Sequence, residues 1–127
     1  MLEKLKDLPP GIEGLKAVGK ITREDYDKVF EPILDDARRE GRRIRFLYQL
    51  GAEFDGFTAG AAWEDAKIGF RSLRLFDGCA IVSDAGWICE VARLAGLLLP
   101  CPVRVFENQA RANAIEWLGT LSEGVDA

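Results

Sequence analysis

The sequence predicts a single α/β domain over residues 1–127: a mostly parallel five-stranded sheet with one antiparallel edge strand and four helices on its two faces. Strand-like and helix-like apolar patterns alternate along the chain with short connections, which favours parallel strands joined by right-handed crossovers. The run from Arg43 to Leu50 is apolar at alternate positions and also at Leu47. A strand that is apolar on both faces is typical of the middle of a covered sheet.

Two strands are expected at the amino-terminal end. Leu2 to Leu8 is interpreted as a short edge strand and Ile12 to Gly19 as a longer one, with Pro9-Pro10-Gly11 as the turn between them. A tight turn joins antiparallel neighbours, so the edge strand is expected to run opposite to the second strand.

The first helix is expected to begin after Thr22, which is a suitable N-cap because acidic residues follow it in the first turn. Apolar residues from Tyr26 to Ala37 then recur at helical spacing and form one stripe. Pro32 interrupts this stripe and should bend or loosen the helix, and Gly41 should end it.

The second half of the chain continues the alternation. In order, we expect a loop from Gly51 to Thr58, a helix from Ala59 to Phe76, a strand from Cys79 to Ser83, a helix from Ala85 to Leu98 capped by Asp84, a strand from Val103 to Phe106, and a final helix capped by Asn108. The third of the four helices carries only two charged residues, Glu90 and Arg93. A helix that is apolar nearly all round is either covered or meets another apolar surface.

Composition excludes several classes of function. Apolar residues make up 48% of the chain and charged residues 30%, which is typical of a folded soluble protein, and the net charge is −4. An acidic chain is a poor general partner for nucleic acid. The one basic cluster, five arginines between Arg38 and Arg45, is interpreted as a solvated helix end, with an anion contact as the alternative.

Few catalytic groups are present. The chain has no histidine, which removes the commonest general base and most zinc sites. Cys79, Cys89 and Cys101 are odd in number and widely spaced, so we expect reduced thiols in a cytoplasmic protein. No apolar run reaches the length of a membrane span. We also expect no cofactor and no bound metal.

Three segments carry a resemblance to a known family. Ile12 to Tyr26, Ala62-Trp-Glu-Asp-Ala-Lys-Ile-Gly-Phe70 and Pro102 to Phe106 resemble the bacterial SpoIIAA-like family, the middle segment being the most specific. The family's fold is similar to the STAS domain of anti-sigma-factor antagonists and to CRAL-TRIO lipid-transfer domains. The resemblance implies this fold and a regulatory or carrier role, with no established enzymatic activity for the family.

The resemblance also raises the question of a phosphorylation switch. STAS antagonists carry a serine or threonine, usually after aspartate, at the start of the helix that follows the central strand. Here Thr58 occupies that region but follows Phe57, and no Asp-Ser pair is present. We interpret Thr58 as the N-cap of the second helix, and a phosphate there as the alternative.

The candidate partner or ligand surface combines the Gly-rich loop with the second and third helices. Parallel strands bring the loops that precede successive helices to one end of a sheet, where ligands of open α/β folds bind. Trp63 is expected either to pack beneath the loop or to form a cavity wall, and Lys67 can contact it or pair with Glu64. The candidate residues are Phe54, Phe57, Thr58, Trp63, Glu64, Asp65, Lys67, Phe70, Trp87 and Leu94.

A second constellation is acidic. Glu53, Asp55 and Asp84 are expected near the carboxyl ends of neighbouring strands, where three carboxylates could hold Mg²⁺. The preferred interpretation is that these side chains are solvated loop acids.

Two functions follow from the sequence. The favoured hypothesis is a non-enzymatic regulatory module that contacts a protein partner or a second copy of itself as a homodimer. The alternative is a carrier or sensor of an apolar or lipid-like ligand, with a membrane surface as one place where it could act. An enzyme is the weakest hypothesis, because no complete nucleophile or metal motif is present.

Overall fold

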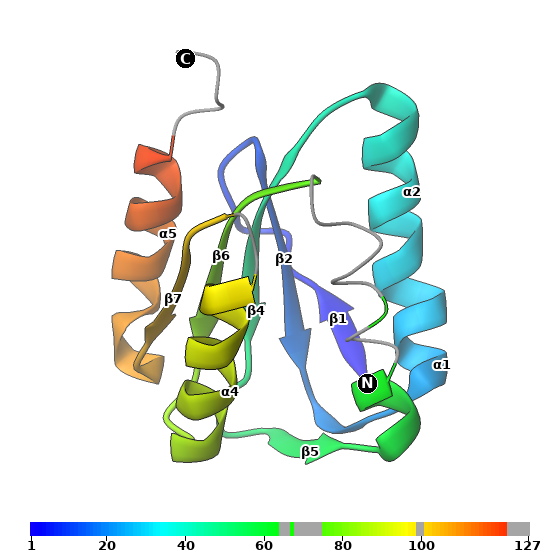
Figure 1. Cartoon of the computed structure of the whole chain (residues 1–127), viewed down its shortest axis with the longest axis vertical. Coiled ribbons are helices and arrows are strands. Elements are labelled where there is room, and N and C mark those ends of the chain that lie inside the picture. Colours follow the sequence, from blue (N-terminus) through cyan, green and yellow to red (C-terminus); the bar gives the residue numbers. More distant parts are fainter. Residues whose placement is uncertain (64–66, 68–74, 99–100, 122–127) are drawn as a thin grey trace.

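The computed structural model describes residues 1–63, 67, 75–98 and 101–121, and its core is a five-stranded sheet (Figure 1). The strand order is β1 (Leu2–Lys4), β2 (Ile12–Ala17), β4 (Ile44–Gln49), β6 (Phe76–Val82) and β7 (Val103–Phe106). β1 is antiparallel to β2, and every other neighbouring pair is parallel. The predicted fold class is therefore confirmed, including the antiparallel edge strand.

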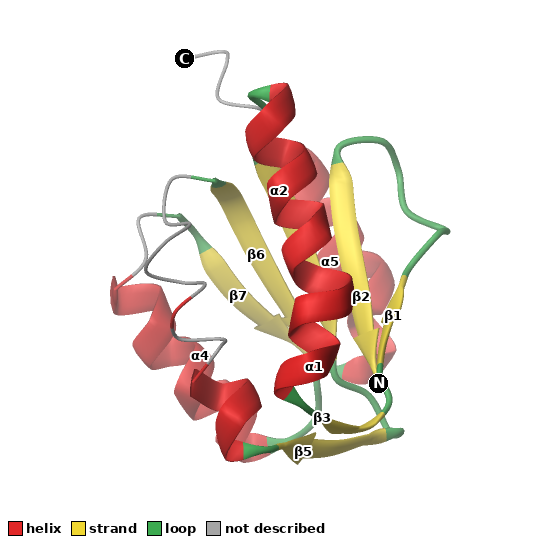
Figure 2. Ribbon diagram, turned by 90° about the vertical axis from the view of Figure 1, so that its right-hand side faces the viewer, coloured by secondary structure: helices red, strands yellow, loops and turns green. Residues whose placement is uncertain are grey.

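Helices cover both faces of this sheet (Figure 2). The continuous helix formed by α1 (Arg23–Asp25), a π-helical turn (Tyr26–Phe30) and α2 (Glu31–Glu40) lies on one face with α4 (Gly86–Leu98). A 3-10 turn (Asn108–Ala110) leads into α5 (Arg111–Thr120), which covers the other face. Leu34 and Leu118 are fully buried in the two separate cores.

The central position of β4 explains its composition. Ile44, Phe46 and Tyr48 point into the core beneath α2, whereas Leu47 points into the core beneath α5. The five residues from Ile44 to Tyr48 are all buried, as expected for a strand with a neighbour on each side and helices on both faces.

The first helix begins and ends as predicted. The Asp25 backbone N–H donates to Thr22 Oγ1 at 3.3 Å and the Thr22 backbone N–H donates to Asp25 Oδ2 at 2.8 Å, which together form a capping box. Gly41 ends the helix in the left-handed conformation, with φ of 65°.

The helix is loosened at the turn before Pro32, which is one of the two predicted outcomes. This turn, Tyr26–Phe30, is π-helical, and the Glu31 N–H donates to the carbonyl of Tyr26, five residues back. A proline near the start of a turn lacks the N–H that an α-helical bond would need, and a π turn is one way for a helix to absorb such an interruption.

The predicted loop from Gly51 to Thr58 is wrong. Residues Phe54–Phe57 form a strand, β5, which pairs in parallel with β3 (Gly19–Ile21) as a separate two-stranded sheet. The predicted strand from Ile12 to Gly19 accordingly divides, because β2 ends at Ala17 and β3 begins at Gly19. This small sheet lies below the carboxyl ends of the main strands (Figure 1).

Several predicted boundaries also move. β1 ends at Lys4 and not at Leu8, and β6 begins at Phe76, which had been placed in the second helix. Residues 59–63 and 67 of that helix are helical, and the rest of its predicted length before Leu75 lies outside the described residues. α4 and β7 match their predicted ranges closely.

The two predicted caps at Asp84 and Asn108 are wrong. The Ala85 N–H donates to Ser83 Oγ at 3.2 Å, so Ser83 caps the turn that precedes α4. Asp84 Oδ1 instead accepts from the backbone N–H of Asn108 at 2.9 Å. Asn108 is the first residue of the 3-10 turn, and its side chain makes no capping bond to α5.

The arginine cluster is engaged in contacts within the molecule. Arg38 and Arg39 pair with acids one turn earlier on α2, and Arg43 contacts Asp77 at 2.8 Å. Arg45 is buried and donates to two carbonyl groups at the end of α5. Arg38 and Arg39 therefore lie at a helix end, as interpreted, whereas the interpretation is wrong for Arg45, which is a buried residue of strand β4.

Candidate functional site

Thr58 joins β5 to the helical segment 59–63. Its Oγ1 accepts a hydrogen bond from the Ala61 N–H at 3.1 Å, and its carbonyl accepts from the Ala62 N–H at 3.0 Å. The predicted N-cap is therefore confirmed, since the side chain satisfies one of the free amides at a helix start.

The aromatic cluster, defined as Phe54, Phe57 and Trp87, connects β5 to α4. The ring centroids of Phe54 and Phe57 lie 5.0 Å apart, and that of Trp87 lies 6.1 Å and 6.3 Å from them. These are the separations at which aromatic pairs attract. The structure thus brings together three of the candidate residues, and both phenylalanines are partly buried against the main core.

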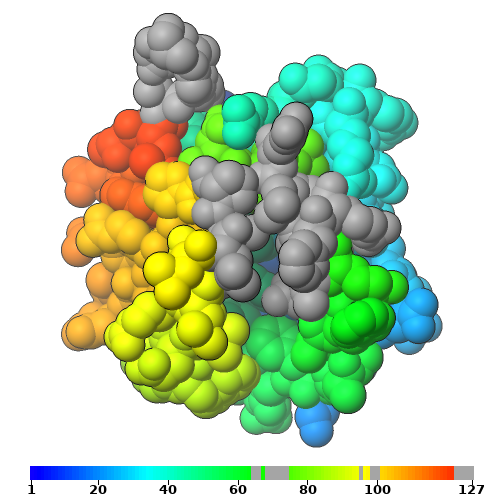
Figure 3. All heavy atoms as spheres, in the orientation of Figure 1, coloured from blue at the N-terminus to red at the C-terminus, as the bar shows by residue number. Residues whose placement is uncertain are grey.

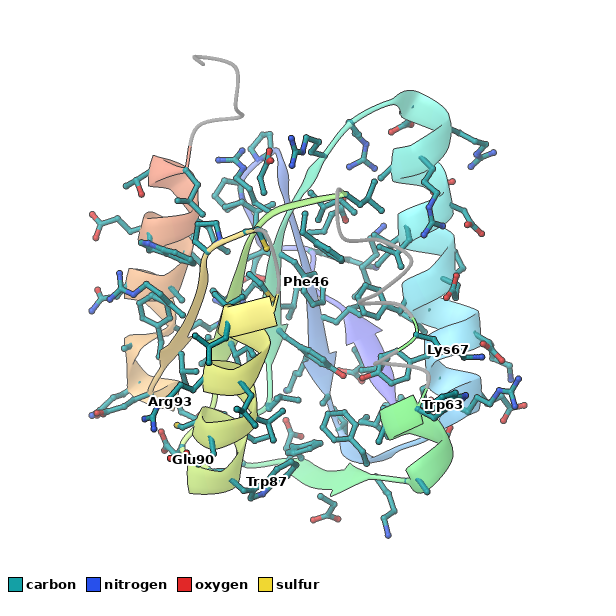
Figure 4. The ribbon with its side chains drawn as sticks, viewed as in Figure 1. Phe46, Trp63, Lys67, Trp87, Glu90 and Arg93 are labelled. Atoms are coloured by element: carbon teal, nitrogen blue, oxygen red, sulfur yellow. The ribbon has the colours of Figure 1, made fainter. Side chains whose placement is uncertain are left out.

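The partner predicted for the two phenylalanines was wrong in one respect. One of the two expectations for Trp63 places it beneath these rings, but its side chain is 64% exposed. In Figure 4 it lies to the right, well away from Trp87 and α4. Trp87 supports the two rings instead. A tryptophan thirty residues along the chain reaches β5 because β4 and β6 are adjacent parallel strands.

The apolar face of α4, defined as Trp87, Val91, Leu94 and Leu97, is turned to solvent. These side chains are 51%, 55%, 63% and 80% exposed, respectively. Ile88 and Ala92 of the same helix are buried. Figure 3 shows the atoms of α4 as a ridge on the surface of the molecule.

Val91 was not among the candidates named from the sequence. The signal was present, because α4 carries more apolar residues than one buried face requires. Periodicity alone does not say whether a second apolar face is covered, and only the packed structure does.

A pocket of about 450 Å³ adjoins the aromatic cluster at the carboxyl ends of β4, β6 and β7. Phe54 and Trp87 line one part of it, whereas Ser83, Asp84 and Asn108 line another. The side-chain oxygen of Asn108 is buried, and no hydrogen-bond partner is found for it among the described residues. Sequence reasoning did not identify Ser83 and Asn108 as site residues. They come close to each other only because β6 pairs with β7.

The three acids considered for Mg²⁺ do not share one set of contacts. Glu53 Oε1 lies 2.5 Å from Lys16 Nζ, and this hydrogen bond raises the pKa of Lys16 above its ordinary value. Asp84 accepts from the Asn108 amide, and both Asp84 and Asp55 line the pocket. Within the described residues, no three acidic or cysteine side chains converge as metal ligands would.

The remaining candidates are placed only in part. Lys67 is helical and half-buried. Glu64, Asp65 and Phe70 lie outside the described residues.

The Cys101 thiol is not activated. Burial, followed by the nearby charge of Asp77, raises the pKa of the Cys101 thiol above its ordinary value. A thiol that resists ionisation is a poor nucleophile.

A comparison with family models decides the relationship that the sequence suggested. The model described as SpoIIAA-like matches residues 12–119. The chain belongs to the SpoIIAA-like family. This family is generally non-enzymatic, and its fold is that of a regulatory-type module.

A solved member of the same fold supports this assignment. The crystal structure of an uncharacterised DUF3478-family protein from Shewanella loihica PV-4, described as having a SpoIIAA-like fold, superposes with a TM-score of 0.75 at 26% sequence identity. The match covers 93% of this chain and 92% of the other. No curated protein matches this SpoIIAA-like chain. In the part of the chain that the structure describes, no helix is long and apolar enough to cross a membrane.

Proposed function

We propose that this SpoIIAA-like protein is a non-enzymatic binding module that acts through protein–protein contacts at the apolar face of α4. The observation that carries the proposal is the exposure of four large apolar side chains on one helix, each more than half accessible. A contiguous apolar patch of this kind marks an interaction site more often than a single exposed residue does. Covering a large apolar side chain contributes roughly 1.5–3 kcal/mol.

The surroundings of this face favour a preformed contact surface. α4 is fixed to the sheet by Ile88 and Ala92 on its buried side. Trp87 is held at the start of the helix by the rings of Phe54 and Phe57. A partner therefore meets an ordered helix, which reduces the conformational entropy lost on binding.

Photocrosslinking in living cells tests the proposal. A benzophenone amino acid is introduced at Leu94, and a matched chain carries it at Glu116, an exposed position on α5. We expect the Leu94 chain to form a protein adduct of defined mass that the Glu116 chain does not form. A second substitution, Val91→Asp, should remove that adduct, because it places a charge in the contact. The proposal fails if Leu94 gives no protein adduct, or the same adducts as Glu116.

The pocket beside the aromatic cluster supports a second candidate function, the binding of a small ligand with an apolar part. Its volume of about 450 Å³ lies in the range of ligand sites, and Phe54 and Trp87 offer it an aromatic wall. Native mass spectrometry of gently purified protein tests this function. A bound mass that disappears in a Trp87→Ala variant would support it, and an unliganded protein would oppose it.

A further inference from the structure

We infer that the partner of the apolar face is α4 of a second copy of this chain, packed antiparallel to the first about a two-fold axis. This inference rests on the proposed function, because it names the occupant of the same surface. Three features of α4 carry it: the placement of its charges, the spacing of its apolar side chains, and its position in the molecule.

The charges of α4 are self-complementary. The helix has two charged residues, Glu90 and Arg93, of opposite sign and three positions apart. Within one chain they pair at 3.3 Å. In an antiparallel pair whose axis passes between Val91 and Ala92, each Glu90 lies level with Arg93 of the second copy. Two such pairs form, and no like charges face each other.

The apolar side chains interleave in the same register. Distances along the helix from the two-fold axis follow from the rise of about 1.5 Å per residue. Trp87 and Val91 lie on one side of this axis, at about 7 and 1 Å. Leu94 and Leu97 lie on the other side, at about 4 and 8 Å. The two-fold operation reverses these positions for the second copy. Side chains from the two copies then alternate along the contact, so that each row fits between the residues of the other, as in ridges-into-grooves packing.

The position of α4 leaves room for a second helix. α4 lies at the edge of the molecule, outside the layer of the sheet (Figure 2). Glu90 and Arg93 extend from its outer side, whereas Trp87 lies at its base beside β5 (Figure 4). The contact is electrically neutral, since the net charge of −4 per chain resides elsewhere. This surface favours a partner that is apolar and carries a matching pair of opposite charges, and a second copy provides both.

Charge reversal tests the inference. Sedimentation equilibrium is measured for the full chain, for Glu90→Arg, for Arg93→Glu, and for an equimolar mixture of the two variants. We expect the unchanged chain to dimerise, and each single variant to raise the dissociation constant at least tenfold because like charges then face each other. The mixture should restore association, since every facing pair is again of opposite sign. Glu116→Arg on α5 makes the same change of charge away from α4 and should have no effect.

The outcomes separate this inference from the proposed function. A monomeric full chain at all concentrations, or a mixture that associates no better than its components, overturns the inference. In the photocrosslinking experiment, a Leu94 adduct of twice the chain mass of 14.1 kDa supports a second copy. An adduct of another defined mass would leave the proposed function standing and overturn the second copy as occupant. Far-ultraviolet circular dichroism verifies that each variant is folded.

Discussion

At the scale of single residues, the helix starts of this protein depend on short side-chain hydrogen bonds. Thr22 and Thr58 each accept from an amide three residues later. Such caps follow from a few neighbouring residues, so the sequence was sufficient to predict both. Asp84 was predicted wrongly because its partner, Asn108, is 24 residues away and approaches it only when β6 and β7 pair.

Thr58→Ala should lower the free energy of unfolding by about 0.5–2 kcal/mol, because it leaves the Ala61 amide without its partner. Thr58→Ser keeps the hydroxyl and is the control, with a loss well below that of alanine. Urea unfolding followed by circular dichroism measures both. We also expect the Leu94 adduct to persist in a folded Thr58→Ala protein, and loss of the adduct there would show that Thr58 acts as more than a cap.

Asp25 should make stability sensitive to acid. Burial alone would raise its pKa, but hydrogen bonds from Thr22 and the charge of the terminal amine more than offset this and lower the pKa below its ordinary value of 3.8. A carboxyl with a lowered folded pKa stabilises the fold above its unfolded pKa, and this contribution disappears as the pH falls through the folded value.

Asp25→Asn should therefore lower the free energy of unfolding at neutral pH. Below about pH 4, where the native carboxyl becomes protonated, the free energy of unfolding of the variant should decrease less than that of the unchanged protein. Urea midpoints measured across this range provide the comparison. Parallel pH profiles for the two proteins would contradict the assignment.

At the scale of elements, β5 shows where local patterns were insufficient. The strand has four residues, and Gly56 in its middle has φ of 115°, a conformation that side-chain-bearing residues rarely adopt. Its partner β3 has three residues and had been assigned in part to β2. Neither segment has enough alternation of apolar and polar residues to indicate a strand by itself. Each becomes a strand because it pairs with the other.

Arg45 links two elements, since it extends from β4 to the end of α5. Its guanidinium donates to the carbonyls of Leu118 and Leu121 at 3.1 and 3.3 Å, and is buried there. Positive charge at a helix C-terminus also complements the helix dipole. Arg45→Met should lower the free energy of unfolding by about 1.5–3 kcal/mol, because buried carbonyls lose a charged donor.

Arg43→Met is the matched control for this link. Arg43 pairs with Asp77 near the surface, where an ion pair contributes roughly 0–1 kcal/mol. Hydrogen exchange should show faster opening of α5 in Arg45→Met and little change in Arg43→Met. Equal effects of the two substitutions would mean that Arg45 does not anchor the helix.

At the scale of the whole molecule, one sheet is shared by two cores. Alternating strand and helix patterns were enough to predict this architecture, because connection length and chirality leave few arrangements. The candidate surface was predictable only in outline. The sequence placed Phe54, Phe57 and Trp87 at one end of the sheet, but the degree of exposure of α4 depends on which neighbours reach it.

The shared sheet predicts a single unfolding transition. Leu34→Ala beneath α2 and Leu118→Ala beneath α5 each remove a fully buried side chain and should cost about 2–5 kcal/mol. Near- and far-ultraviolet circular dichroism should report the same midpoint in each variant. Separate midpoints would show that one face of the sheet loses its helix independently.

The half-exposed indole of Trp87 also has an optical consequence. Its ring has water on one side and the rings of Phe54 and Phe57 on the other. Any occupant of the apolar face would replace that water and move the emission of this indole to shorter wavelength. Trp63 and Trp117 lie on other elements and would keep their own emission, so the chain carries its own fluorescent reporter at the surface where a partner is expected.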